Sequence, residues 1–320
     1  MSKDRKYFAG LDLGGTFLKF ALGNPDEGML VKKQIPSKAD QSQDAIFEVI
    51  FSAITDLQNC AKERGGELVA VGVGSPGAIH FKECRLLGST PNLPEWTNAP
   101  IRERIQGRFG IPVWADNDGN MMAFGESRQG AAKGCQHVLC ATLGTGIGGG
   151  ILINGSLYRG SHYAGSEIGH LSVVHNGRLC NCGGQGCFEQ YASATAMIRR
   201  YRERMFELNQ PAPESGGTKL IFDRAEQGEA IAREIIAETV DYLGSGFASL
   251  VNIFNPQVLV IGGGVAEAGD DFIARVERAV HGKAMKPVLE GLKVVRAVLG
   301  NDAGCIGAFH LAAEMYEMSK

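Results

Sequence analysis

The chain has 320 residues, a length that fits two domains. Its 32 Lys and Arg against 35 Asp and Glu leave a net charge of −3, which offers no basic surface for nucleic acid or an acidic membrane. No apolar run approaches the roughly 18 residues of a transmembrane helix, and the first residues lack an apolar signal core. We therefore expect a cytoplasmic protein with neither nucleic-acid nor membrane partners.

The chain opens with two apolar runs, residues 7–12 and 17–22, joined by Leu13-Gly-Gly-Thr16. This pattern predicts a strand, a glycine-rich turn and a second strand, and since no helix follows the glycines it is neither a Rossmann fingerprint nor a P-loop. Such a turn exposes backbone N–H groups that can bind phosphate, although tight turns also use glycine for geometry alone. Asp12, at the end of the first run, could hold Mg²⁺ directly or through water.

Helical spacing of apolar residues over 45–62 predicts a helix, and residues 69–73 predict a buried strand. A further helix should carry Ile101 and Ile105, with Asn98 as a candidate cap. A short strand over 111–115 then leads to Asp116-Asn-Asp118, where a turn-capping role suits Asp116.

The opening pattern returns as a strand over 138–142, the turn Leu143-Gly-Thr-Gly146 and a strand over 147–153. Two copies predict two related α/β domains with a cleft between them, whose turns could hold two parts of one polyphosphate. A third glycine cluster, 262–264, follows a strand and is either another close-approach site or a plain turn. Helices are expected over 223–254, from about Asp270, and over 304–318.

His170, Cys180, Cys182 and Cys187 have the spacing H-x₉-C-x-C-x₄-C, with glycines between the cysteines. Three thiols and an imidazole predict a closed tetrahedral Zn²⁺ site with a structural role, unless the cysteines are merely buried. Four protein ligands leave no open position, so a zinc hydrolase is excluded.

Two acidic residues flank this predicted metal loop, Glu167 before it and Glu189 after it. Zinc would take one nitrogen of His170 and orient the other toward a ligand. Acceptors and a donor held rigidly together suit the recognition of a neutral polyhydroxyl compound, in which each hydroxyl needs a partner.

The sequence resembles the ROK family of sugar kinases and repressors over nearly its whole length. The matching motifs are Asp12-Leu-Gly-Gly-Thr16, Pro91-Asn-Leu-Pro94, Asn117-Asp118, residues 143–150, Glu167-Ile-Gly-His170, residues 180–189 and residues 262–264. The resemblance implies an α/β, two-lobed, actin-like ATPase (RNase H-like) fold with a central cleft. It implies a small lobe over 1–118, on which a helix over 304–320 packs back, and a large lobe over 119–303 with the zinc loop.

The resemblance also implies ATP-dependent phosphorylation of a hexose at its 6-hydroxyl, with Mg²⁺ accompanying ATP, in a homodimer or homotetramer. Asp118 matches the catalytic base of the family. The positions that match its sugar ligands are Asn92, Asn117, Glu167, His170 and Glu189. The positions that match its ATP contacts are Asp12, Gly14, Gly15, Thr16, Gly144, Thr145, Gly146, Gly262 and Gly263.

Glu167 before Ile-Gly-His resembles the glucose-phosphorylating members, so glucose is the first expectation. Fructose, mannose, allose, N-acetylglucosamine and N-acetylmannosamine remain open, as does polyphosphate as donor. A non-catalytic sugar sensor is the other alternative, but a sensor has no need of the base Asp118. Repressors of the family place a helix-turn-helix before the first strand, and here Phe8 already lies in that strand, which argues against a DNA-binding regulator.

Overall fold

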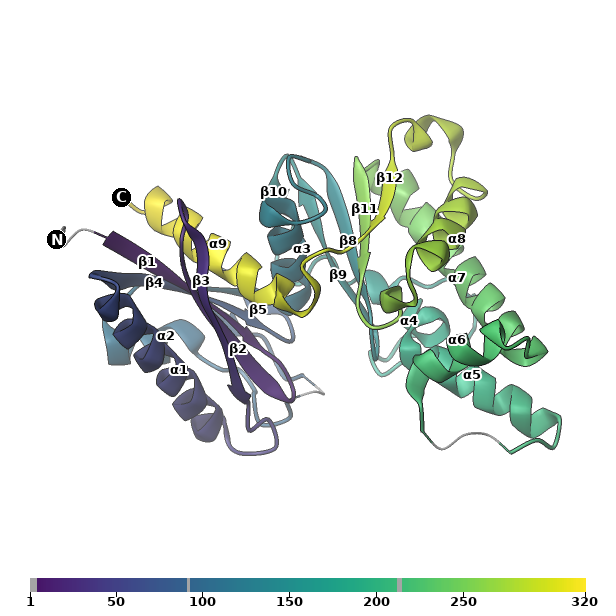
Figure 1. Cartoon of the computed structure of the whole chain (residues 1–320), viewed down its shortest axis with the longest axis horizontal. Helices are drawn as coiled ribbons and strands as arrows, with labels where there is room; N and C mark the ends of the chain where they lie inside the picture. The colour runs from purple at the N-terminus through teal and green to yellow at the C-terminus, as the bar shows by residue number, and fades with distance from the viewer. Residues whose placement is uncertain (1–4, 91–92, 212–214) are drawn as a thin grey trace. The chain divides into compact units, whose positions relative to one another are not determined.

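The structure, a computed structural model, describes residues 5–90, 93–211 and 215–320. The chain divides into two compact units. The first unit comprises Met1–Gly134, Leu157–Ser166 and Asn301–Lys320, and the second comprises Cys135–Ser156 and Glu167–Gly300. Figure 1 shows the course of the chain, with its last helix lying beside its first strand.

A five-stranded sheet forms the centre of the first unit, in the order β3-β2-β1-β4-β7. β1–β3 form an antiparallel meander, whereas β4 and β7 run parallel to β1. The strands are β1 (Arg5–Leu13), β2 (Phe17–Asn24), β3 (Gly28–Pro36), β4 (Gly66–Ser75) and β7 (Val113–Asn117); the short strands β5 (Ile79–His80) and β6 (Arg85–Leu86) pair separately.

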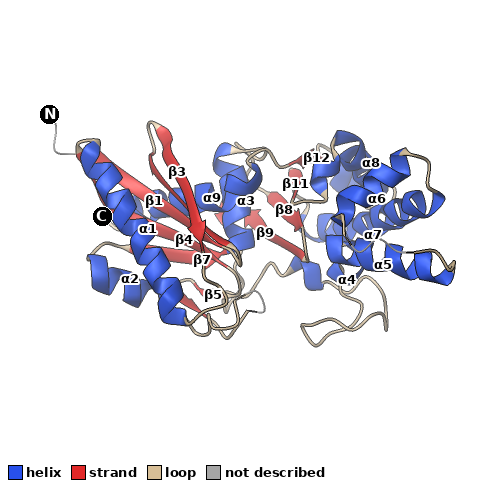
Figure 2. Ribbon diagram, turned by 60° about the horizontal axis from the view of Figure 1, so that its bottom comes forward, coloured by secondary structure: helices blue, strands red, loops and turns tan. Residues whose placement is uncertain are grey.

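Helices cover both faces of this sheet. Side chains along β1 alternate in direction, so apolar residues of this strand lie on each face and need to be covered. Tyr7, Ala9 and Leu11 belong to the core that includes α1 (Gln43–Glu63) and α2 (Ile101–Phe109). Phe8 packs with residues of α9 (Ala303–Met318) on the other face. Figure 2 shows α1 and α2 together on one side of the strands.

Glycines bring α9 into close contact with the first unit. A Cβ atom built on Gly72 of β4 would lie 1.9 Å from the carbonyl oxygen of Ala308. One built on Gly307 would lie 1.8 Å from the carbonyl oxygen of Met121, in α3 (Asp118–Gln129). The expected helix over 304–320 therefore does pack on the N-terminal sheet. The same packing holds α3 in the first unit, which extends to Gly134 and not to the expected boundary at residue 118.

The second unit repeats the plan of the first, with a sheet in the order β10-β9-β8-β11-β12. β8 pairs antiparallel with β9 and parallel with β11, as β1 does with β2 and β4. This topology confirms the predicted duplication. The strands are β8 (Val138–Leu143), β9 (Ile147–Ile153), β10 (Ser156–Leu157), β11 (Val258–Gly262) and β12 (Lys293–Arg296).

The helices of the second unit gather on one side of its sheet (Figure 2). The expected helical stretch over 223–254 is divided between α6 and α7, with a turn at Gly228. The helices are α4 (Glu189–Ala192), α5 (Ala194–Glu207), α6 (Gly217–Glu226), α7 (Ala230–Phe254) and α8 (Asp270–His281), with short 3₁₀ turns η1 (Ile168–His170), η2 (Ala266–Ala268), η3 (Lys286–Leu289) and η4 (Gly300–Asp302). No helix in the described ranges has both the length and the apolar character needed to cross a membrane.

The prediction that Asn98 caps the helix beginning at residue 101 is wrong. Pro100 occupies the capping position of α2 and makes no side-chain hydrogen bond there. Asn98 instead adopts a left-handed φ of 50°, and its Oδ1 accepts a hydrogen bond from Gly88 N at 3.0 Å. The asparagine stabilises a turn because its side chain reaches the backbone ten residues earlier.

Candidate functional site

Three aspartates, Asp12, Asp116 and Asp118, lie at the carboxyl ends of the parallel strands of the first sheet. The parallel register places Asp12 of β1 beside Gly74 of β4, and Gly74 beside Asp116 of β7; Asp118 begins α3 directly after that strand. Burial raises the pKa of Asp12 to about 6, and repulsion by Asp118 adds to the shift. Burial also raises the pKa of Asp118, although a hydrogen bond from Gly119 N opposes that shift. Both acids are therefore better proton acceptors than ordinary surface carboxylates.

The start of α3 fixes the position of Asp118. Asn117 caps the helix, since its Oδ1 accepts from Gly119 N at 2.8 Å and from Asn120 N at 3.2 Å. Its Nδ2 donates to the carbonyl oxygen of Gly77 at 3.1 Å. The amide has two hydrogens, so the predicted role of Asn117 as a sugar ligand rests on the second one.

Asp12 lies against the first turn of α9. A Cβ atom built on Gly304 would lie 2.8 Å from Asp12 Cγ, and only glycine leaves this space to the carboxylate. The N-terminal end of a helix favours negative charge. The geometry is thus consistent with a charged group at this position.

The two glycine-rich turns occupy equivalent places, between β1 and β2 and between β8 and β9, but the second turn is one residue shorter. In the first turn, Gly14 N donates to Phe17 O at 3.0 Å, and Gly15 and Thr16 are exposed. In the second turn, Gly144 N donates to Gly146 O at 3.0 Å, and Thr145 is exposed. Each unit thus presents a hairpin tip without large side chains between its glycines, as a phosphate-binding loop requires.

The third glycine cluster has a structural explanation of its own. Gly263 has a φ of 85°, and a Cβ atom there would lie 2.5 Å from the carbonyl oxygen of Leu143. The end of β11 therefore packs against the end of β8 through glycine. The adenosine contact expected at Gly262 and Gly263 stays a prediction.

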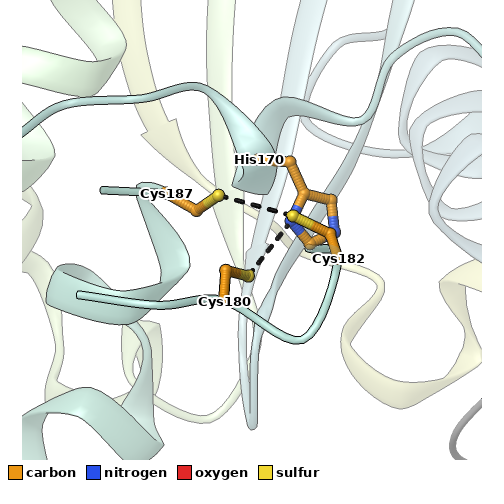
Figure 3. Close-up of side chains that lie close together, drawn as sticks. All are labelled: His170, Cys180, Cys182 and Cys187. Carbon is orange, nitrogen blue, oxygen red and sulfur yellow. Dashed lines mark hydrogen bonds between the residues drawn. The ribbon is translucent and has the colours of Figure 1, made fainter. Parts of the chain in front are cut away.

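The four predicted metal ligands come together in the second unit (Figure 3). Their ligand atoms all lie within 4.8 Å of one another. Cys182 Sγ is 3.6 Å from Cys187 Sγ, and Cys180 Sγ is 3.6 Å from His170 Nδ1. Sulfurs on a tetrahedral zinc, with bonds of about 2.3 Å, are about 3.8 Å apart, so the cluster has the size and donor set of a Cys₃His zinc site.

The loop between these ligands folds through its glycines. Cys180 N donates to Gly184 O at 2.9 Å, and Gly183 N donates back to Cys180 O at 3.0 Å. Gly186 has a φ of 75°, and a Cβ atom there would lie 1.8 Å from Val174 O. A larger residue at Gly186 would push the segment that carries Cys187 away from the other ligands.

The predicted sugar residues of the second unit gather around this cluster. Glu167 precedes η1, and its carbonyl oxygen accepts from His170 N at 3.1 Å, so the two residues share one turn. Glu189 Oε1 accepts from Cys180 Sγ at 3.3 Å, while a Cβ atom on Gly146 would lie 2.5 Å from Glu189 Oε2. Glu189 thus links the metal cluster with the second glycine turn. Asn92 lies outside the described residues.

The sequence reasoning missed one charged residue of the first unit, Arg159. Asp116 does not cap the helix, because Asn117 occupies that position. Asp116 Oδ2 instead pairs with Arg159 Nε at 2.6 Å. The two residues are 43 positions apart, and no spacing rule connects them.

Comparison with known proteins places this geometry in context. The model of the ROK family matches residues 8–315. The chain belongs to the ROK family. It is 35% identical to a glucokinase of Thermotoga maritima over 312 residues, which cover 95% of this chain and 96% of that protein.

Other relatives carry different functions or bound ligands. A xylose repressor of Caldicellulosiruptor bescii is 27% identical, over 96% of this chain and 78% of its own length. A crystal structure of a ROK family glucokinase from Streptomyces griseus, in complex with glucose and AMPPNP, superimposes with a TM-score of 0.80 at 31% identity, over 96% of this chain and 99% of that one. The fold class expected from the sequence, two α/β units of the actin-like ATPase type, is confirmed.

Proposed function

We propose that this chain is an ATP-dependent sugar kinase that transfers the γ-phosphoryl group of ATP to the 6-hydroxyl of glucose. The observation that carries the proposal is the half-buried Asp118 carboxylate, held at the start of α3 near Asp12, at the carboxyl ends of the parallel strands β1, β4 and β7. Ligands of open α/β sheets bind at that edge. The similarity to glucokinases supports glucose as the acceptor.

Asp118 acts as the general base in this proposal. A primary alcohol is a poor nucleophile at neutral pH, and a carboxylate within hydrogen-bond reach takes its proton as the oxygen attacks phosphorus. Burial raises the pKa of Asp118, which increases its affinity for that proton. The hydroxyl oxygen forms its bond to the γ-phosphorus while the bond to the β–γ bridging oxygen breaks, leaving ADP.

MgATP is the second substrate. The exposed turns at Gly14-Gly15-Thr16 and Gly144-Thr145-Gly146 offer backbone N–H groups to its phosphates. Asp12 would hold the magnesium ion that accompanies ATP, directly or through water. A cation bound there would lower the free energy of keeping Asp12 and Asp118 ionised.

Glu167, His170 and Glu189, with Asn92 and Asn117, supply acceptors and donors for the sugar hydroxyls. His170, Cys180, Cys182 and Cys187 would hold a zinc ion that stiffens the loop and takes no part in the chemical step. Nδ1 of His170 faces the cluster, so Nε2 is the nitrogen that would meet a sugar hydroxyl.

A coupled assay of ADP release tests the proposal with glucose, mannose, fructose, allose, N-acetylglucosamine and N-acetylmannosamine, each with ATP or polyphosphate. We expect kcat/KM to be highest for glucose with ATP, and glucose 6-phosphate to be the product. Asp118→Asn is the control for contaminating kinases. A protein that binds glucose but releases no ADP with any sugar would instead be a sensor.

A further inference from the structure

We propose that Arg159 is a positioning residue of the phosphoryl-transfer site, which holds the Asp116 carboxylate and thereby the start of α3 that carries Asp118. The inference rests on the proposed kinase function. It concerns a residue that touches neither the sugar nor the nucleotide in that proposal. Its support is a buried ion pair and the place of Arg159 in the chain.

Arg159 belongs to a segment that we call the strap, Leu157–Ser166. The strap is part of the first unit, although the second unit precedes and follows it in the sequence. Gly165 N donates to Arg159 O at 2.9 Å, and Ser166 Oγ donates to Tyr158 O at 2.8 Å, so the strap closes on itself.

The backbone of the strap is also constrained. Tyr163 and Ser166 have φ angles of 61° and 69°, a left-handed conformation that such residues adopt only where their surroundings enforce it. The Tyr163 ring lies edge-on to the ring of His80 in the first unit, with centroids 4.6 Å apart. The strap is therefore held to the first unit in one defined conformation.

The strongest anchor is the ion pair between Arg159 Nε and Asp116 Oδ2, at 2.6 Å. The side chains are only 18% and 3% exposed, and the guanidinium carbon lies 3.8 Å from the centre of the Phe81 ring. A buried carboxylate needs a counter-charge, because water does not solvate it there. Among the residues the structure describes, Arg159 is the one cationic side chain in an ion pair with Asp116.

The other oxygen of Asp116 organises the residues around Asp118. Asp116 Oδ1 accepts from Asn117 N at 2.8 Å and from Asn120 Nδ2 at 2.9 Å. These two residues stand immediately before and two positions after Asp118. Arg159 thus fixes one oxygen of a carboxylate whose other oxygen fixes the turn that presents the proposed base.

The strap also leads into the proposed sugar-binding turn. Ser166, its last residue, is joined by a peptide bond to Glu167, which shares a turn with His170. Loss of the arginine should therefore disturb the position of Asp118 and the position of the chain just before Glu167. It should leave the glycine turns proposed to bind phosphate unchanged.

Steady-state kinetics of Arg159→Ala with glucose and ATP tests this inference. We expect kcat to fall ten- to a hundredfold, since displacement of a catalytic group by about 1 Å has that effect, while KM for MgATP stays within about twofold. Arg104→Ala is the matched control: Arg104 also pairs with a carboxylate, Asp44 at 2.8 Å, and lies over a phenyl ring, Phe47. This more exposed pair joins α2 to α1 and makes no contact with Asp116, so the loss of Arg104 should leave kcat unchanged.

Chemical rescue distinguishes positioning from mere stabilisation. Millimolar guanidinium should restore kcat of Arg159→Ala several-fold and leave wild type unchanged. A folded variant with kcat within twofold of wild type, or a lost kcat that guanidinium does not restore, overturns the inference. If Arg159→Ala does not fold, Arg159→Lys replaces it, because lysine keeps the charge but lacks the planar donors. A kcat of Arg159→Lys equal to that of wild type would also overturn the inference. A wild type without kinase activity would reject the proposed function instead.

Discussion

The chemical roles proposed for Asp12 and Asp118 oppose what these residues contribute to stability. Each carboxylate is partly removed from water, and each repels the other, so the ionised pair is unfavourable in the unliganded protein. Side chains whose replacement would increase the stability of the fold are characteristic of active sites. The following two predictions separate the two acids by their effects.

Asp12→Asn should stabilise the protein in the absence of nucleotide. In the folded protein the pKa of Asp12 is raised to about 6, so ionisation of this carboxylate lowers the free energy of unfolding. The full stability is present below the pKa of the unfolded chain and is lost as pH rises through 6. Removing the charge should therefore increase the free energy of unfolding by about 1–3 kcal/mol at pH 7.5, with a smaller gain below pH 5. Urea unfolding at both pH values measures this difference.

The matched control for that experiment is Asp40→Asn, since Asp40 is exposed. Its stability should follow wild type at both pH values. The same Asp12→Asn variant should lose most of its kinase activity, because the magnesium of MgATP loses its protein partner. A variant less stable than wild type at pH 7.5 would contradict the electrostatic reasoning.

Asp118→Asn should slow turnover strongly and keep sugar binding. The asparagine has nearly the same shape but cannot take the hydroxyl proton, and such bases contribute about 10²- to 10⁴-fold to the rate. We expect kcat to fall by that factor, and the glucose Kd from calorimetry to change less than about fivefold. A near-normal kcat would remove Asp118 from the proposed mechanism.

At the scale of elements, glycines decide how closely helices approach. Gly307 of α9 touches the backbone of α3, whereas Gly107 of α2 has no atom within 4 Å of the position a Cβ would take. We expect Gly307→Ala to lower the free energy of unfolding by about 1–3 kcal/mol through overpacking. Gly107→Ala should raise it by about 0.5–1 kcal/mol, because alanine favours the helix. Thermal unfolding of both variants compares the two directly.

The metal loop is the second element whose stability can be tested. Zinc analysis should find about one ion per chain, and chelation should lower Tm by several degrees and raise the glucose KM, because the loop carries Glu167 and Glu189. Cys187→Ser should reproduce both effects, while Cys135→Ser, outside the cluster, should leave them unchanged. Metal-free protein with an unchanged Tm and glucose KM would contradict the zinc assignment.

At the scale of the whole molecule, the sequence predicts local patterns better than distant contacts. The glycine hairpins, the duplication and the four metal ligands follow from short motifs, and the structure confirms their arrangement. The boundary after residue 118 was not predictable, because α3 joins the first unit through contacts with α9, far along the chain. The pairing of Asp116 with Arg159 escaped prediction for the same reason. Asn98 shows the converse case, where a residue suited to a helix cap serves a turn instead.

The most direct test is a crystal structure with glucose and a non-hydrolysable ATP analogue bound. We expect one carboxylate oxygen of Asp118 within about 2.6–3.2 Å of the 6-hydroxyl, with that hydroxyl in line with the γ-phosphate and both glycine turns against the phosphates. A complex in which Asp118 points away from the 6-hydroxyl, with the sugar still held by Glu167 and His170, would contradict the mechanism proposed for this protein.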